Sequence, residues 1–74
     1  MEVEVKLFAS FRNGRWKGKR LSFAYEVSIK DILKILNINE DELGILLVNG
    51  SYSKIDTILK NNDVLAIFPP VAGG

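Results

Sequence analysis

Residues 2–9 read EVEVKLFA, and in this stretch aliphatic or small side chains alternate with charged or aromatic ones. The members of the apolar face are Val3, Val5, Leu7 and Ala9. Alternation with a period of two is typical of a β-strand that is buried on one side. The pattern therefore predicts a half-buried strand over Glu2–Ala9.

A second strand and a helix are predicted after this strand. Apolar residues alternate again over 20–25, and the turn-rich stretch before them contains Asn13-Gly14, so the two strands are expected to form a hairpin. Ser28 stands at an N-cap position, with apolar residues following at i, i+3, i+4 and i+7 spacing, which predicts an amphipathic helix over about Ile29–Leu36. The apolar face of this helix is expected to pack against a sheet.

The second half of the chain predicts further strands. Ile45–Val48 is an apolar run ended by Asn49-Gly50, a pair that suits a tight turn. We expect a brief edge strand at Tyr52-Ser53, a short helical turn over Asp56–Leu59 and a last strand over Val64–Phe68. The order ββαββ predicts an α+β roll with one main helix and a mixed sheet of four to five strands.

The composition is that of an ordinary folded domain with little catalytic equipment. Of its 74 residues, 47% are hydrophobic and 26% charged, and no apolar run approaches the ~20 residues that span a bilayer. The absence of cysteine and histidine excludes disulfides, thiolate metal sites and the commonest general base. No apolar signal segment follows Met1, so we expect a cytoplasmic protein that binds no metal and is not a self-sufficient enzyme.

Basic residues are unevenly distributed, although the formal net charge is only +1. No acidic residue occurs between Glu4 and Glu26, and Phe11 and Trp16 lie among the cations of this interval. The cations are Lys6, Arg12, Arg15, Lys17, Lys19 and Arg20. Cations contact phosphates and aromatic rings stack on bases, so a nucleic-acid patch is one alternative. We favour a solvated or protein-docking loop, because these charges fall short of a nucleic-acid footprint.

Residues 68–74 read FPPVAGG. Pro69 and Pro70 cannot donate to a sheet ladder and hold φ at about −65°, so they end the strand and stiffen the segment that follows. Gly73 and Gly74 carry no side chain and can enter a narrow channel in a partner enzyme. We therefore predict a domain over 1–68 and a flexible tail over 69–74, whose terminal carboxylate is a substrate for another enzyme.

Over essentially its whole length the sequence resembles the MoaD/ThiS family of ubiquitin-like sulfur carriers, most of all MoaD, the small subunit of molybdopterin synthase. The residues that carry the resemblance are the FPPVAGG ending, Leu7-Phe8-Ala9 with Arg12, and Val48-Asn49-Gly50. The resemblance implies the β-grasp fold of ubiquitin, with the first and last strands parallel at the centre of the sheet. Two features depart from it: Asn61-Asn62-Asp63 replaces an Asp-Gly-Asp turn, and the loop at 15–17 is unusually basic.

The chemistry that the resemblance implies centres on Gly74. An E1-like enzyme of the MoeB type would use ATP and magnesium to convert its carboxylate into an acyl-adenylate, and a persulfide donor would then give a thiocarboxylate. The tail would next insert into a MoaE-like large subunit and supply sulfur for molybdopterin. The inserting residues would be Pro69, Pro70, Val71, Ala72 and Gly73. ATP and magnesium belong to the partner, so this chain would bind no cofactor.

An apolar docking patch is predicted beside the root of the tail. Phe8 lies out of pattern among charged residues, and Phe68 has the opposite parity to the inward residues of the last strand, so both rings are expected on the exposed face of the sheet. By the resemblance, Tyr52 matches an apolar contact position and Arg12 matches the arginine that follows the first strand. All four residues are therefore assigned to partner binding.

Three alternatives stay open at this point. A ThiS-like carrier for thiamine thiazole or for tRNA thiolation would use the same terminal chemistry and differ only in the acceptor. A ubiquitin-like modifier would join Gly74 to a target lysine through an isopeptide bond. A nucleic-acid-binding module would act through the cations over 12–20 and bind with a steep dependence on salt.

Overall fold

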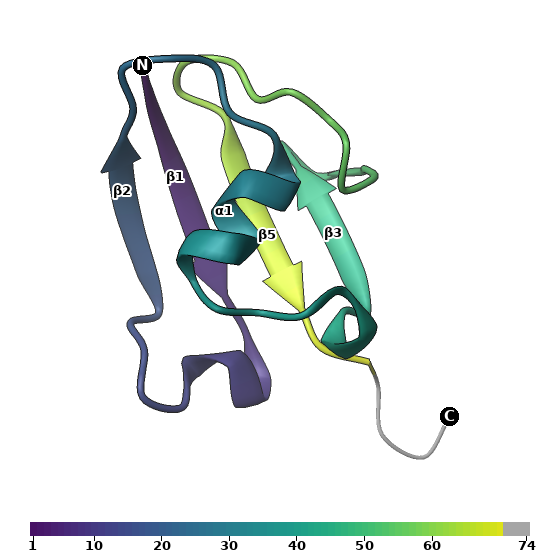
Figure 1. Ribbon diagram of the computed structural model, residues 1–74. Coiled ribbons are helices and arrows are strands. Elements are labelled where there is room, and N and C mark those ends of the chain that lie inside the picture. Colours follow the sequence, from purple (N-terminus) through teal and green to yellow (C-terminus); the bar gives the residue numbers. More distant parts are fainter. Residues whose placement is uncertain (71–74) are drawn as a thin grey trace.

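The computed structural model describes residues 1–70 and shows a five-stranded mixed sheet with one α-helix across one face (Figure 1). The elements, in which η marks a short 3-10 helix, are β1 (Glu2–Leu7), η1 (Ala9–Arg12), β2 (Gly18–Ser22), α1 (Ile29–Ile35), η2 (Glu40–Glu42), β3 (Ile45–Val48), β4 (Ser51–Tyr52) and β5 (Val64–Phe68). The strand order is β2-β1-β5-β3-β4. β1 and β5 pair in parallel, and every other pairing in this sheet is antiparallel. The predicted β-grasp roll is confirmed.

The core lies between the sheet and α1. Alternation along β1 and β5 points every second side chain toward the helix, and the apolar face of the helix packs against these side chains. The residues that are at most 1% exposed are Val3, Val5, Leu7, Ile29, Ile32, Leu33, Leu59, Leu65 and Ile67. Within residues 1–70 no helix has the length and apolar character needed to cross a membrane.

Helix α1 begins after Ser28, as the sequence predicts. The Ser28 hydroxyl accepts a hydrogen bond from the Asp31 backbone N–H at 3.1 Å, and the Asp31 carboxylate accepts one from the Ser28 N–H at 3.0 Å. This reciprocal pair is a capping box, which satisfies two backbone donors at the helix start. The hydrogen bonds from Ser28 also hold the pKa of Asp31 below its usual value.

The first hairpin differs from the prediction at both strand ends. β1 stops at Leu7, because the chain turns to send Phe11 into the core; Ala9 instead begins η1, with a φ of 51°. β2 covers Gly18–Ser22 rather than 20–25. The last residue of β2, Ser22, pairs with Glu2 at the start of β1. The predicted strand continued to Tyr25, but no strand lies beside Tyr25 and its side chain is 84% exposed.

The second half confirms β3 and the turn after it. Asn49 and Gly50 both have positive φ values, 52° and 84°, which suit the tight turn into β4. β4 lies one residue earlier than predicted, at Ser51–Tyr52. The predicted helical turn over Asp56–Leu59 is wrong: within that range Ile58 forms an isolated bridge with Ser28, which carries Leu59 into the core in extended form.

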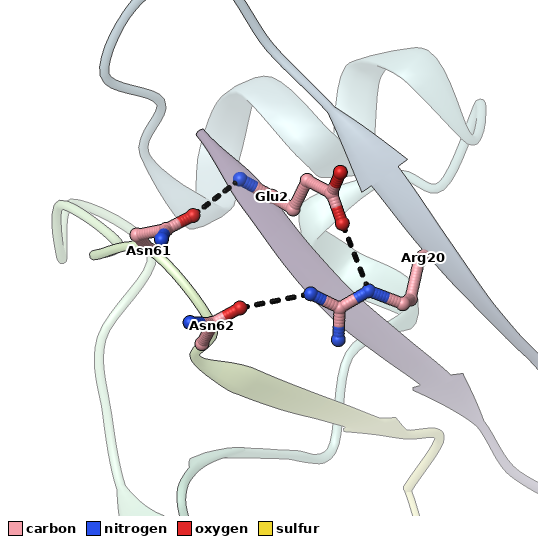
Figure 2. A network of polar contacts seen from close by, with 4 residues as sticks. All are labelled: Glu2, Arg20, Asn61 and Asn62. Atoms are coloured by element: carbon pink, nitrogen blue, oxygen red, sulfur yellow. Dashed lines mark hydrogen bonds and ion pairs between the residues drawn. The ribbon is translucent and has the colours of Figure 1, made fainter.

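The turn before β5 is tied to the first hairpin by side chains (Figure 2). Arg20 donates from Nε to the Glu2 carboxylate at 3.0 Å and from Nη2 to Asn62 Oδ1 at 2.8 Å, while Asn61 Oδ1 accepts from the Glu2 N–H at 2.8 Å. Asn62 has a φ of 69°. Asparagine tolerates this left-handed conformation better than most residues, so it can stand where the resembled family has glycine.

Candidate functional site

The central strands bring two aromatic rings together where the chain leaves the sheet. β1 and β5 set Leu7 beside Ile67, so the residues that follow, Phe8 and Phe68, also lie side by side. Their ring centroids are 4.2 Å apart and the ring planes differ by 10°, which is a stacked pair. Because Leu7 and Ile67 point into the core, the two rings lie on the opposite face of the sheet. They cover one another in part, so each is half-buried rather than fully exposed.

η1 places Arg12 against this pair. The guanidinium carbon of Arg12 lies 5.1 Å from the centroid of the Phe8 ring, within cation–π range, and its Nε donates to the Leu7 carbonyl at 2.7 Å. Within residues 1–70 its two Nη groups have no hydrogen-bond partner. They can therefore donate to a carboxylate on another protein.

Tyr52 lies farther along the same face. β4 pairs it with Leu47 of β3, which in turn lies opposite Ala66 of β5. Directly paired residues point to the same side of a sheet, so Tyr52 shares the face of the stacked rings. The outer apolar face, as we call this set, consists of Phe8, Ile45, Leu47, Tyr52, Ala66 and Phe68. Tyr52 is 82% exposed and the other five are half-buried.

The chain leaves the sheet through Pro69 and Pro70, of which the first is half-buried and the second exposed. Neither proline can donate a backbone hydrogen bond. The Phe68 carbonyl still accepts one from the Gly44 N–H at 2.8 Å, which fixes the position of the residue just before the prolines. The other predicted tail residues lie outside the described residues, and their roles stay predictions. They are Val71, Ala72, Gly73 and Gly74.

The side chains around the tail root are of types suited to binding rather than to proton transfer. Phenylalanine and proline side chains carry no transferable proton, and a guanidinium stays protonated in proteins. No group of three or more acidic side chains within residues 1–70 is placed to hold a metal ion. An apolar surface with a guanidinium at its edge suits contact with another protein.

Several residues behind the nucleic-acid alternative have structural roles. Arg15 donates from Nε and Nη2 to the Leu36 carbonyl at 3.2 and 3.1 Å, where α1 ends, and Arg20 belongs to the network in Figure 2. Phe11 is buried and Trp16 is half-buried against the core, so both rings take part in packing within the domain. These internal contacts account for much of the basic and aromatic character of the loop.

Comparison with known families assigns the chain. The sequence profile described as the ThiS family matches residues 5–74, which is nearly the whole length. The chain belongs to the ThiS family. The predicted membership among MoaD/ThiS-like, ubiquitin-like proteins is thereby confirmed, and these are small carrier or subunit proteins. A comparison with curated proteins found no match.

Solved structures similar to this ThiS-family chain include molybdopterin converting factor subunits and small archaeal modifier proteins. One is a putative molybdopterin converting factor subunit 1 from Pyrococcus furiosus, with 28% identity, 96% of this chain and 99% of that chain covered, and a TM-score of 0.76. A complex of subunits 1 and 2 of molybdopterin-converting factor from Helicobacter pylori matches with 25% identity, full coverage of both chains and a TM-score of 0.66. Small archaeal modifier protein 1 from Methanosarcina acetivorans matches with 30% identity, 99% and 96% coverage, and a TM-score of 0.69.

Proposed function

We propose that this chain is a sulfur carrier whose Gly74 carboxylate is adenylated and then converted to a thiocarboxylate, and that its sulfur is used to build molybdopterin. The observation that carries the proposal is the ThiS-family match, which extends from β1 to the Gly-Gly ending. The likeness to a molybdopterin converting factor subunit 1 supports the choice of acceptor pathway. A ThiS-like acceptor, thiazole or tRNA, would change only the last transfer.

The proposed chemistry begins with a poor electrophile. A Gly74 carboxylate oxygen attacks the α-phosphorus of ATP on an E1-like, MoeB-type enzyme, pyrophosphate leaves, and the acyl-adenylate that forms has AMP as its leaving group. The terminal sulfur of a protein persulfide then attacks the acyl carbon and releases AMP. A second thiol on the partner cleaves the resulting acyl disulfide, so the thiocarboxylate leaves as the partner's two thiols become a disulfide. Magnesium, ATP and the thiols all belong to the partners.

The body of the domain would guide the tail into these partners. An apolar surface is offered by the stacked rings of Phe8 and Phe68 beside the tail root and by the exposed ring of Tyr52 farther along the same face. At its edge Arg12 offers Nη donors that have no partner within residues 1–70. Aromatic side chains and arginine are the residue types that most often dominate binding energy at interfaces. The likeness to a two-subunit complex supports a MoaE-like large subunit as one occupant of this surface.

The test is intact-mass analysis of the purified chain after incubation with ATP, magnesium, a MoeB-type enzyme and a persulfide donor. We expect the mass increase of one oxygen replaced by one sulfur, located in the C-terminal peptide. A chain without Gly74 is the matched control and should not change in mass. If the intact chain releases no pyrophosphate with any E1-like enzyme of its own organism, the proposal is wrong.

A ubiquitin-like modifier is the second candidate, supported by the likeness to small archaeal modifier protein 1. It shares the acyl-adenylate, but a lysine amine rather than sulfur would receive the Gly74 acyl group. The modifier predicts conjugates of high mass in cells, with branched Gly-Gly on target lysines. These conjugates should disappear when Gly74 is removed, whereas a dedicated sulfur carrier forms none.

A further inference from the structure

The backbone of Gly44 lies unusually close to the root of the tail. A β-carbon built on Gly44 would lie 2.5 Å from the Pro69 carbonyl oxygen, 2.6 Å from the carbonyl carbon and 2.7 Å from the Pro70 nitrogen. Ordinary contacts of a β-carbon begin at about 3.4 Å, so any side chain would displace this peptide group. Gly44 does not have a left-handed φ. Its lack of a side chain therefore matters because it lets the Pro69–Pro70 peptide approach closely.

The hydrogen bonds around Gly44 explain why the chain passes so near. The register of β3 and β5 pairs Ile45 with Phe68, yet the Gly44 N–H also donates to the Phe68 carbonyl. The Gly44 N–H thus bonds the residue that lies opposite Ile45, so the regular β3–β5 register does not continue to a Gly44–Pro69 pair. The Pro69–Pro70 peptide then follows against the open side of Gly44.

We propose that Gly44 is a positioning residue for the C-terminal tail, because it seats the Pro69–Pro70 peptide and so sets the direction in which the tail leaves the sheet. The inference rests on the proposed function for its consequence in catalysis, but the positioning itself belongs to the free chain. Gly44 lies two residues after the end of η2, so the seat directs the root toward η2 and away from η1 (Figure 1). Two consecutive prolines are stiff, so a shift at the seat is carried outward along the chain.

The first experiment uses Gly44→Ala, with Gly18→Ala as the matched control. Gly18 also lies on the sheet without a left-handed φ, but a β-carbon there meets its nearest atom at 3.7 Å. With a MoeB-type enzyme we expect Gly44→Ala to lower kcat for pyrophosphate release by about tenfold to a hundredfold, with KM changed less than threefold, since misplacing a reacting group by ~1 Å has effects of this size. Gly18→Ala should keep both constants. Equal kcat in both variants would overturn the inference.

The second experiment needs no enzyme and separates this inference from the proposed function. The chain has no cysteine, so Val71→Cys creates a single site for a nitroxide label, whose broadening of backbone amide signals reports proximity. With Gly44 present, we expect the broadening of amide signals to be centred on residues 39–44. After Gly44→Ala, we expect the broadening to shift toward residues 8–13 or to become weaker throughout. The same broadening pattern in both proteins would refute the positioning role even if the chain is adenylated. A changed pattern would support it even if no enzyme activates the chain.

Discussion

Arg15 shows how a residue in a cationic loop can act as a structural clamp. Its guanidinium donates to the carbonyl of Leu36, the C-cap of α1, and to the Phe11 carbonyl at 3.3 Å. Backbone carbonyls at a helix end lack partners within the helix, and a cation there also interacts favourably with the helix dipole. Arg15 thus joins the loop after η1 to the end of the helix.

Replacing Arg15 tests this clamp. We expect Arg15→Ala to lower the free energy of unfolding by ~1–2 kcal/mol, because charge-assisted hydrogen bonds to carbonyls that stay partly buried are lost. Lys17→Ala removes a cation from the same loop, where Lys17 is exposed, and should change stability by less than ~0.5 kcal/mol. Urea denaturation of the three proteins measures both effects. Similar losses in the two variants would mean that Arg15 acts only through loop charge.

The sequence predicted which face of the sheet a residue would occupy more reliably than which groups that residue would contact. Phe8 and Phe68 stood out because parity along a strand is a local property, and the structure brings them together. The roles of Arg15 and Gly44 depend on which carbonyl or peptide group the fold brings near them. A single glycine before an apolar strand carries no local signal for a contact with residues 69 and 70. The nearer of these, residue 69, is 25 positions away in the sequence.

At the scale of elements, helix α1 is the best example of local determination. Its start was predicted from Ser28 and the apolar spacing, both of which lie within the helix or beside it. The ends of β2 were not predicted correctly. A strand ends where its partner ends, and β1 supplies partners only from Glu2 onward. The segment over 56–59 was wrongly predicted as a helical turn for a similar reason. Its extended form depends on a bridge to Ser28, which is a non-local contact that the local sequence does not encode.

The capping box makes the stability of α1 depend on pH. The hydrogen bonds from Ser28 hold the pKa of Asp31 below its usual value in the folded chain, so folding favours the ionised carboxylate. The resulting stabilisation is fully present above the pKa of the unfolded chain, at about 4, and is lost as pH falls through the lower pKa of the folded chain.

Asp31→Asn isolates this effect. We expect the variant to have a lower urea midpoint than the unaltered chain at neutral pH, and the gap between the two midpoints to narrow as pH falls below about 4. Glu26→Gln, which removes a nearby exposed carboxylate outside the helix, is the control and should show no such narrowing. A gap for Asp31→Asn that stays constant down to acid pH would show that the carboxylate charge contributes nothing.

At the scale of the whole molecule, the β-grasp topology places the stacked rings and the root of the tail at the same end of the two central strands, β1 and β5. β1 and β5 are far apart in sequence, but their parallel pairing makes Phe8 a neighbour of Phe68 at the tail root. The periodic pattern predicted the elements, and the family resemblance supplied their order. Strand order depends on non-local pairing, which periodicity alone does not encode.

Phe8→Ser tests the outer apolar face as a docking surface. We expect binding to the activating enzyme to weaken at least about tenfold, because central aromatic residues dominate such interfaces. The loss of stacking on Phe68 should cost only ~1 kcal/mol of stability. Tyr25→Ser removes a ring that is 84% exposed but outside this face, and it should leave binding unchanged. Calorimetric titration with the folded variants measures the affinity, and equal values for Phe8→Ser and the unaltered chain would rule out this surface.

Truncation after Pro70 separates docking by the domain from chemistry at the tail. The last residue of the buried core within the described part of the chain is Ile67, and the contact of Gly44 with the Pro69–Pro70 peptide is retained in a chain of residues 1–70. We therefore expect this chain to melt within a few degrees of the full-length protein, since residues beyond the core contribute little to stability.

The truncated chain should also compete for the activating enzyme without being activated. It keeps the outer apolar face and Arg12 but lacks Gly74, so it should inhibit pyrophosphate release by the full-length chain competitively while releasing none itself. Competition within about tenfold of the KM of the full-length chain would mean that most binding energy comes from the domain, as expected where a few anchors dominate an interface. If the truncated chain fails to compete, the tail provides the affinity and the docking role of Phe8 and Phe68 is wrong. If it is adenylated at Pro70, the enzyme does not read the Gly-Gly ending, and the channel argument for Gly73 and Gly74 fails.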